Sequence, residues 1–312
     1  MGENCVIELK WYKKSISIFI FIALLFLLTN CNAQTSANID TTRRLKTTIL
    51  AATSFYAGMA AYSYYLWYKD TPNSSFHWVN DNSSWFQLDK IGHATTGYTF
   101  SEYSYHVLRW GGLNNKKAAM YGALFGFGNM ASIEIYDGFH SKWGASWGDL
   151  VANACGPLLF GTQQLIWNEQ RIRMKFSYLP SDKYALLNPA KLGENQLNRI
   201  FEDYNSQTYW LSANIASFIS KPTKFPKWLN IAFGYGARGL GVSPQLDNSG
   251  NILPDYIRTR EYYLSLDIDL QRIPTKSKTL KTIFKLVSFV KIPFPTLGYN
   301  KTDKCRWYWM YI

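Results

Sequence analysis

The sequence predicts a mainly α-helical protein, with a bundle of about four helices followed by a smaller, mixed and partly β region. Long apolar-rich segments with helix start and stop signals predict the bundle, within residues 41–176. Alternating apolar and polar residues predict strands within residues 177–312. Aromatic residues make up 17% of the chain, which excludes a disordered protein, because disordered segments contain few aromatics.

The first expected helix is the most apolar one. Thr47–Tyr68 carries no charged residue over 22 positions, which is long enough to span a bilayer, since that takes about 20 residues. Eight basic residues near the ends of the expected helices would then all lie on one side of a four-span bundle: Arg43, Arg44, Lys46, Lys116, Lys117, Arg171, Arg173 and Lys175. With a cleaved leader, that side would be the outer one, against the usual charge bias. The sequence leaves open a spanning bundle and a bundle that only partly enters the membrane.

Three further helices complete the expected bundle. Gly111-Gly112 marks the end of one of them, and Asn114 or Asn115 caps the next. Gly122 and Gly126 lie four residues apart, so a neighbouring helix can approach closely there. A bend is expected at Gly156-Pro157. The expected helices are Asp89–Trp110, Lys116–Tyr136 and Ser146 to about Lys175.

The C-terminal region alternates like a set of strands. In one segment, Ser265, Asp267 and Asp269 alternate with apolar residues, which is typical of a strand with one buried face. A short basic amphipathic helix is expected near Lys278–Val287, and it fits either a membrane surface or an ordinary solvated surface. A short helix is also expected at Asn195–Tyr204. The expected strands are Thr208–Ile219, Trp228–Gly234, Tyr262–Leu270 and Arg306–Ile312.

Residues 1–33 predict a signal peptide. Three lysines precede an apolar run, Ile16–Leu28, which is followed by small residues suited to a signal peptidase. We expect cleavage after Ala33. Two alternatives remain: the segment ending at Cys31 resembles a lipobox, so that a lipid would be attached to Cys31, or the leader stays as an uncleaved anchor. Each predicts an exported protein, periplasmic or associated with an envelope membrane.

The net charge of +12 is unevenly distributed. Residues 34–170 hold nine basic and nine acidic residues, whereas residues 171–312 hold 21 basic and ten acidic ones. Because an exported chain does not meet nucleic acid, we exclude that partner and expect an anionic membrane surface instead. Beyond the leader only Cys155 and Cys305 remain; they could form one disulfide, but the apolar surroundings of Cys155 favour a buried free thiol.

Polar residues gather on the three helices where apolar ones would be expected. Residues four apart share a helix face, as do residues three apart, so each helix presents a polar group. If these faces converge, the bundle contains a polar pocket. The candidate residues are Asp89, Lys90, His93, Glu134, Asp137, Ser146, Asp149 and Asn153.

This order of motifs resembles a known pattern. Asp89-Lys90-x-x-His93, a small-residue helix carrying Glu134, and Ser146-x-x-Asp149 followed by Asn153 resemble VanZ-like membrane proteins. They resemble more closely a bacterial family of predicted periplasmic lipoproteins of unknown function (YfiM-like), over about residues 85–162. The resemblance implies an envelope location and a helical bundle, and it supplies no catalytic assignment. The export leader and the long basic tail depart from VanZ-like proteins.

Four roles fit the polar residues. Imidazole and carboxylates suit zinc, manganese or iron, although the spacing matches no strong metal motif. His93 or Glu134 fits a general base of a hydrolase acting on envelope lipids or glycans. Lys90 and His93 fit a pocket for a lipid or glycan head group. The residues also fit a buried hydrogen-bond network that fixes helix register.

We therefore expect an exported, membrane-associated envelope protein that binds or scaffolds without catalysis, with a polar pocket for a lipid or glycan head group. The alternative is a membrane-associated hydrolase or metalloenzyme acting on envelope lipids or glycans. The sequence identifies neither a cofactor nor a protein partner.

Overall fold

The computed structural model describes residues 41–312, apart from 181, 220–224, 247–248 and 251. The signal peptide expected at residues 1–33, its cleavage after Ala33 and the alternative lipid on Cys31 lie outside the described residues.

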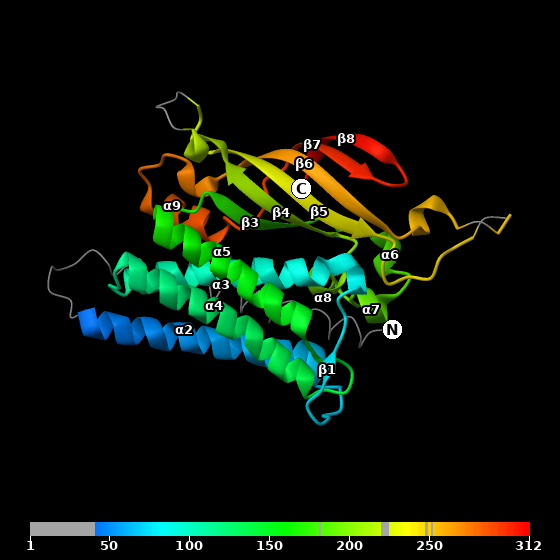
Figure 1. The fold of residues 1–312 in the computed structure, drawn as a ribbon, viewed down its shortest axis with the longest axis horizontal. Coiled ribbons are helices and arrows are strands. Elements are labelled where there is room, and N and C mark those ends of the chain that lie inside the picture. The colour runs from blue at the N-terminus through cyan, green and yellow to red at the C-terminus, as the bar shows by residue number, and fades with distance from the viewer. Residues whose placement is uncertain (1–40, 181, 220–224, 247–248, 251) are drawn as a thin grey trace, which may run out of the picture.

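The helical layer and the sheet lie one against the other, with the long helices beneath the sheet in Figure 1. The described chain has eight α-helices rather than about four: four are long, as predicted, and four are short connections. Asn114 caps α4 by accepting the Lys117 N–H, as expected. The long helices are α2 (Thr41–Ser63), α3 (Leu88–Trp110), α4 (Asn115–Gly138) and α5 (Trp147–Trp167). The short ones are α6 (Asp182–Ala185), α7 (Pro189–Leu192), α8 (Gln196–Glu202) and α9 (Lys278–Leu286).

The C-terminal region is built on a six-stranded antiparallel sheet in which each strand pairs with its neighbours in sequence. Two short strands, β1 (Trp78–Val79) and β2 (Ala145–Ser146), pair separately in parallel. The six strands are β3 (Ile172–Tyr178), β4 (Gln207–Asn214), β5 (Leu229–Arg238), β6 (Thr259–Ile268), β7 (Phe294–Asn300) and β8 (Lys304–Tyr311).

The predicted helix from Ser146 to about Lys175 is too long. It ends at Trp167, because Asn168 adopts a left-handed conformation with φ 56°, which commonly ends a helix. β3 then begins at Ile172, so the expected boundary at 176–177 falls inside a strand. Strands β3 and β7 were not predicted.

Glycines bring the long helices into contact, as expected for Gly122 and Gly126. A β-carbon on Gly126 would lie 2.6 Å from the carbonyl oxygen of Gly97 in α3. On Gly156 of α5 it would lie 1.8 Å from the carbonyl oxygen of Ala94, also in α3. These backbone approaches fix how α4 and α5 pack on α3, and therefore how the polar faces meet.

Gly156→Ala should push α5 away from α3 and lower the free energy of unfolding by about 1–3 kcal/mol, the usual cost of overpacking a tight contact. Gly128 in α4 has nothing within 4 Å of the same position. Gly128→Ala is therefore the matched control, and it should stabilise by about 0.5–1 kcal/mol through helix propensity. Urea unfolding of both variants checks the pair; equal effects would contradict the close contact.

Among the described residues, no helix is both long and apolar enough to cross a membrane. The two described cysteines, Cys155 and Cys305, are free, and both are exposed. The expectation of a buried thiol at Cys155 was wrong, because the apolar stretch of α5 that contains it faces outward: Val151 and Leu158 are exposed as well.

The sheet is inverted relative to an ordinary soluble sheet. The alternation predicted in Tyr262–Leu270 is present, but Ser265, Asp267 and Asp269 are the buried residues, whereas Leu264 and Leu266 are exposed. We call the side with Ser265 the inner face and the side with Leu264 the outer face. The sheet curls around its inner face: the ring of Tyr311 in β8 stacks on Tyr263 in β6.

The inner face combines a buried aromatic cluster around Trp210 and Tyr263 with paired polar groups. Lys175 of β3 forms an ion pair with Asp267 of β6 at 2.7 Å, and both side chains are fully buried. Asp267 also accepts a hydrogen bond from Ser212 of β4. Because buried charges must be paired, these contacts explain how polar residues occupy the interior.

A second buried ion cluster joins the helices to the sheet. Arg173 of β3 contacts Glu102 of α3 at 2.6 Å and Asp269 at 3.3 Å. Arg272 also bonds Asp269, and Gln271 donates to Glu102. Burial favours the neutral acid, but Arg173 outweighs burial and lowers the pKa of Glu102 to about 2. The cluster therefore holds α3 against β3 through charges that are satisfied within the fold.

Candidate metal centre

The start of α3 carries three of the candidate residues. Trp85, Phe86 and Gln87, directly before the helix, all have positive φ angles, between 49° and 64°. This sharp turn, anchored by the burial of Leu88 against Tyr209 of β4, places Asp89, Lys90 and His93 in the first two turns of the helix.

The start of α5 supplies the opposite wall. Ser146 caps the helix, and its hydroxyl accepts the Asp149 N–H at 3.2 Å. The Ser146 hydroxyl donates to Asp81 at 2.5 Å, and its backbone N–H donates to Glu134 of α4 at 2.9 Å. Ser146 therefore ties α4 and the loop before α3 to the N-terminus of α5, where the helix dipole favours anions such as Asp149.

Lys90 lies at the centre of three carboxylates. Its ammonium group contacts Asp81 at 2.5 Å, Asp149 at 3.0 Å and Asp89 at 3.4 Å. Burial favours the neutral amine, but these carboxylates outweigh it and raise the pKa of Lys90. In its contacts with Asp89 and Asp149, the Lys90 ammonium group lies against the Oδ2 atom of each carboxylate.

His93 is held in one tautomer by its neighbours. Asn153 donates its amide N–H to the carbonyl of Met130 at 3.2 Å, so its Oδ1 faces the imidazole. His93 Nδ1 lies 2.9 Å from that oxygen and therefore donates to it. In the neutral imidazole this leaves Nε2 as a lone-pair donor, on the side where Asp89 Oδ1 lies 3.8 Å away.

Three ligand-type side chains converge next to Lys90. One donor atom each of Asp89, His93 and Asp149 lies within 4.8 Å of the other two. Asp149 Oδ1 is buried and has no hydrogen-bond partner among the described residues, and the same holds for Glu134 Oε1. Glu134 Oε1 lies 3.6 Å from His93 Nδ1. Since buried polar atoms are nearly always paired, the unpartnered Asp149 Oδ1 indicates an incomplete site, whereas Glu134 Oε1 lies on the Nδ1 side of the imidazole.

Several carboxylates lie close together in the site, and their proximity shifts the pKa values of the titratable groups. Burial, and then the charge of Asp89, raises the pKa of Asp149 to about 6. Burial raises the pKa of Glu134 to about 7. For His93, burial favours the neutral ring, but the surrounding carboxylates outweigh it and raise its pKa. The site therefore carries more negative charge than its two cationic side chains balance.

Seven of the eight candidate residues meet in this site, and Asp137 lies at its margin. Asp137 accepts a hydrogen bond from Tyr68 at 2.7 Å, and burial raises its pKa to about 6. Two contributors were not predicted. Asp81 lies in an Asn- and Asp-rich loop whose composition indicates only a turn. Tyr204, which donates to Asp89 at 2.6 Å, comes from the C-terminal region, where no local pattern marks it.

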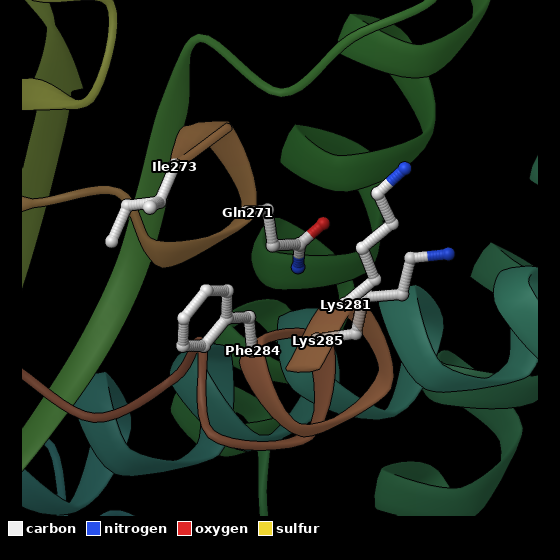
Figure 2. A pocket seen from close by; sticks show the side chains of 5 residues that line it. All are labelled: Gln271, Ile273, Lys281, Phe284 and Lys285. Carbon is white, nitrogen blue, oxygen red and sulfur yellow. The ribbon is translucent and has the colours of Figure 1, made fainter. Parts of the chain in front are cut away.

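A small pocket lies elsewhere, at α9. Figure 2 shows its lining, in which the side chains of Lys281 and Lys285 extend to one side and that of Phe284 lies on the other. None of the eight candidate residues lines it. The lining residues are Gln271, Ile273, Lys281, Phe284 and Lys285.

Residues 77–161 match the model of a family described as predicted periplasmic lipoproteins (DUF2279). The matched stretch covers about a quarter of the chain and contains all eight candidate residues and Asp81. The match agrees with the expected export and envelope location, and it supports the lipoprotein part of the resemblance. No curated protein and no solved structure matches the chain.

Proposed function

We propose that the protein is an envelope-associated metal-binding protein that holds a divalent first-row cation between Asp89, His93 and Asp149. The observation that carries this proposal is the convergence of one donor atom each from Asp89, His93 and Asp149, together with the buried, unpartnered Oδ1 of Asp149. One imidazole and two carboxylates form a donor set suited to zinc, manganese or iron. A divalent cation would also balance the excess of carboxylates.

The surroundings of His93 support the same proposal. Ligand histidines usually donate their second ring N–H to a carbonyl or carboxylate oxygen, which fixes the ring and leaves the other nitrogen for the metal. Asn153 accepts from Nδ1 here, and Glu134 lies on the same side of the ring. This arrangement prepares Nε2 as a ligand before any metal arrives.

The geometry disfavours the head-group pocket in the form that we expected. A phosphate would need Lys90 and His93 as partners, but Lys90 already contacts three carboxylates. An additional anion would meet the carboxylates of Asp89 and Asp149, and like charges at such distances repel. The cluster therefore favours a cation over an anionic lipid or glycan group.

A purely structural network explains part of the cluster, namely the Ser146, Asn153 and Lys90 contacts. It does not explain Asp149 Oδ1, because a finished network would satisfy this buried oxygen. The two roles therefore separate by residue: Asn153 and Ser146 fix the helices, whereas Asp89, His93 and Asp149 bind the cation.

Metal titration of the full chain, stripped with chelator and followed by competition with a zinc indicator dye, tests the proposal. We expect one Zn²⁺ per chain, with Mn²⁺ competing, and at least 100-fold weaker binding in Asp149→Asn and His93→Gln. Asp137→Asn is the matched control, because it removes a neighbouring carboxylate outside the ligand set; its affinity should change less than tenfold. Equal losses in all three variants, or no binding by the wild type, would overturn the proposal.

A second candidate is a metal-dependent hydrolase acting on envelope lipids or glycans. The observation that favours it is Glu134, a carboxyl group with a raised pKa and an unpartnered oxygen beside the ligand histidine, as general acid–base groups require. Incubation of extracted envelope lipids and glycans with the zinc-loaded protein, followed by mass spectrometry, tests it. Cleavage should disappear in Glu134→Gln while zinc still binds.

A further inference from the structure

An exposed apolar row crosses the outer face of the sheet. Its members are aligned by strand pairing, each directly opposite the next, from β4 to β8. Each is between 42% and 53% exposed. The row consists of Leu211, Phe233, Leu264, Leu297 and Trp307, and Ile231, Tyr262, Leu266, Tyr299 and Trp309 extend it on both sides.

The helices leave this apolar row largely uncovered. The start of α3 covers only one end of the outer face, where Leu88 packs with Tyr209 and Ala237. The inner face is meanwhile occupied by polar side chains such as Lys175 and Asp267, so the apolar residues are not directed into the interior. A contiguous exposed apolar patch of this kind marks a binding surface.

The charged groups at one end of the sheet indicate which surface it binds. Arg260, Lys301 and Lys304 are exposed near the ends of β6, β7 and β8, whereas Arg306 contacts Asp303 at 3.6 Å. The two acids in this region, Glu261 and Asp303, are both paired with Arg238 and largely buried. The exposed charges of this rim are therefore cationic, and they complement anionic head groups.

The exposed tryptophans fit the same partner. Trp307 and Trp309 lie in the last strand, and Trp309 is the more exposed, at 79%. Tryptophan and tyrosine favour the boundary between lipid head groups and hydrocarbon, because their rings are apolar while one end can form a hydrogen bond. Tyr262 and Tyr299 lie in the neighbouring row of the face.

We propose that the outer face of β4–β8 binds the hydrocarbon boundary of an anionic phospholipid layer, with the basic rim of Arg260, Lys301 and Lys304 at the head groups. This proposal is independent of the metal site. The full chain would rest on an envelope membrane through this face, and the polar cluster would be carried by the helical layer.

Vesicle flotation of the full chain in a Cys31→Ser background, which removes any lipid at that position, tests the proposal. We expect at least tenfold stronger binding to phosphatidylethanolamine–phosphatidylglycerol vesicles than to phosphatidylcholine vesicles, weakened by salt. Phe233→Thr, Leu264→Thr and Leu297→Thr combined should weaken binding at least tenfold, because threonine keeps strand propensity while removing apolar surface. The matched control changes the exposed helical residues Leu124 and Leu158 to Gln. A loss in this control alone would overturn the proposal.

A probe at Cys305 tests directly whether the outer face is the part of the protein that meets the lipid. Cys305 pairs with Tyr299 on the outer face and is exposed. A fluorophore on Cys305, with the other cysteines changed to Ser, should be quenched by spin-labelled phospholipids on vesicle binding. A probe at Lys142→Cys, on an exposed loop of the helical layer, should be quenched much less. Equal quenching at both positions would contradict the proposal. So would a stable dimer in lipid-free solution that the triple variant dissociates, because a second copy would then cover the face.

Discussion

Replacing Arg173 with Met should lower the free energy of unfolding by about 3–5 kcal/mol, because it leaves two buried carboxylates without their shared cation. Arg173 is 7% exposed, and its partners Glu102 and Asp269 are 5% and 1% exposed. Gln271 and Arg272 can compensate only in part. Denaturant unfolding measures the loss.

Arg171→Met is the matched control. Arg171 lies two residues away and pairs with Glu169 at 2.9 Å, but both side chains are more exposed. Surface pairs of this kind contribute at most about 1 kcal/mol, so the control should remain close to the wild type. Equal losses in both variants would contradict a special role of the buried cluster.

The same cluster predicts a pH dependence. The folded-state pKa of Glu102, about 2, is lower than its ordinary value of 4.5. The unfolded chain therefore binds the proton more readily, and the stabilisation present above pH 4.5 is lost as the pH falls towards 2. Arg173→Met should flatten this part of the stability curve, and unfolding measured between pH 6 and 2.5 checks it.

Zinc should stabilise the metal-free protein by about 2.7 kcal/mol when its free concentration is 100 times the dissociation constant, provided that it binds only the folded state. The gain should vanish in Asp149→Asn. That variant should itself lose less than about 1 kcal/mol in the absence of metal, since burial and Asp89 already disfavour the Asp149 carboxylate.

Thermal unfolding with and without zinc measures both quantities. Asp137→Asn again serves as the control, because Asp137 bonds Tyr68 rather than the ligand set. It should keep the zinc-dependent gain. A variant of Asp149 that is strongly destabilised without metal, combined with a wild type that does not respond to zinc, would assign the cluster to structure alone.

Much of the helical layer was predictable because its signals are local. Asn114 caps α4, Gly111 follows the end of α3, and Ser146 caps α5. Their spacing placed Asp89, Glu134 and Asp149 on polar faces of three helices, but whether these faces converge could not be read from it. Spacing could not predict contacts between distant segments. Tyr204 donates to Asp89 from 115 residues away, and no pattern in either segment indicates this hydrogen bond.

The strands were harder to predict, because the usual rule that apolar residues face the interior of a sheet does not hold here. In β3, the buried positions are Arg173, Lys175 and Ser177, so the segment lacks a buried apolar side and was assigned to a helix. In β6 the alternation was clear, but it did not tell which side was buried. Only the ion pairs that cross the sheet, such as Lys175 with Asp267, make a polar interior possible.

The most direct test of the metal site is X-ray diffraction at the zinc absorption edge from crystals of the zinc-loaded protein. We predict one anomalous peak bounded by Asp89, His93 Nε2 and Asp149 Oδ1, at the 2.0–2.2 Å distances typical of zinc bound to nitrogen and oxygen. Asn153 should still accept from His93 Nδ1. An anomalous map without a peak there, at saturating zinc and with Lys90 still joining the three aspartates, would contradict the account.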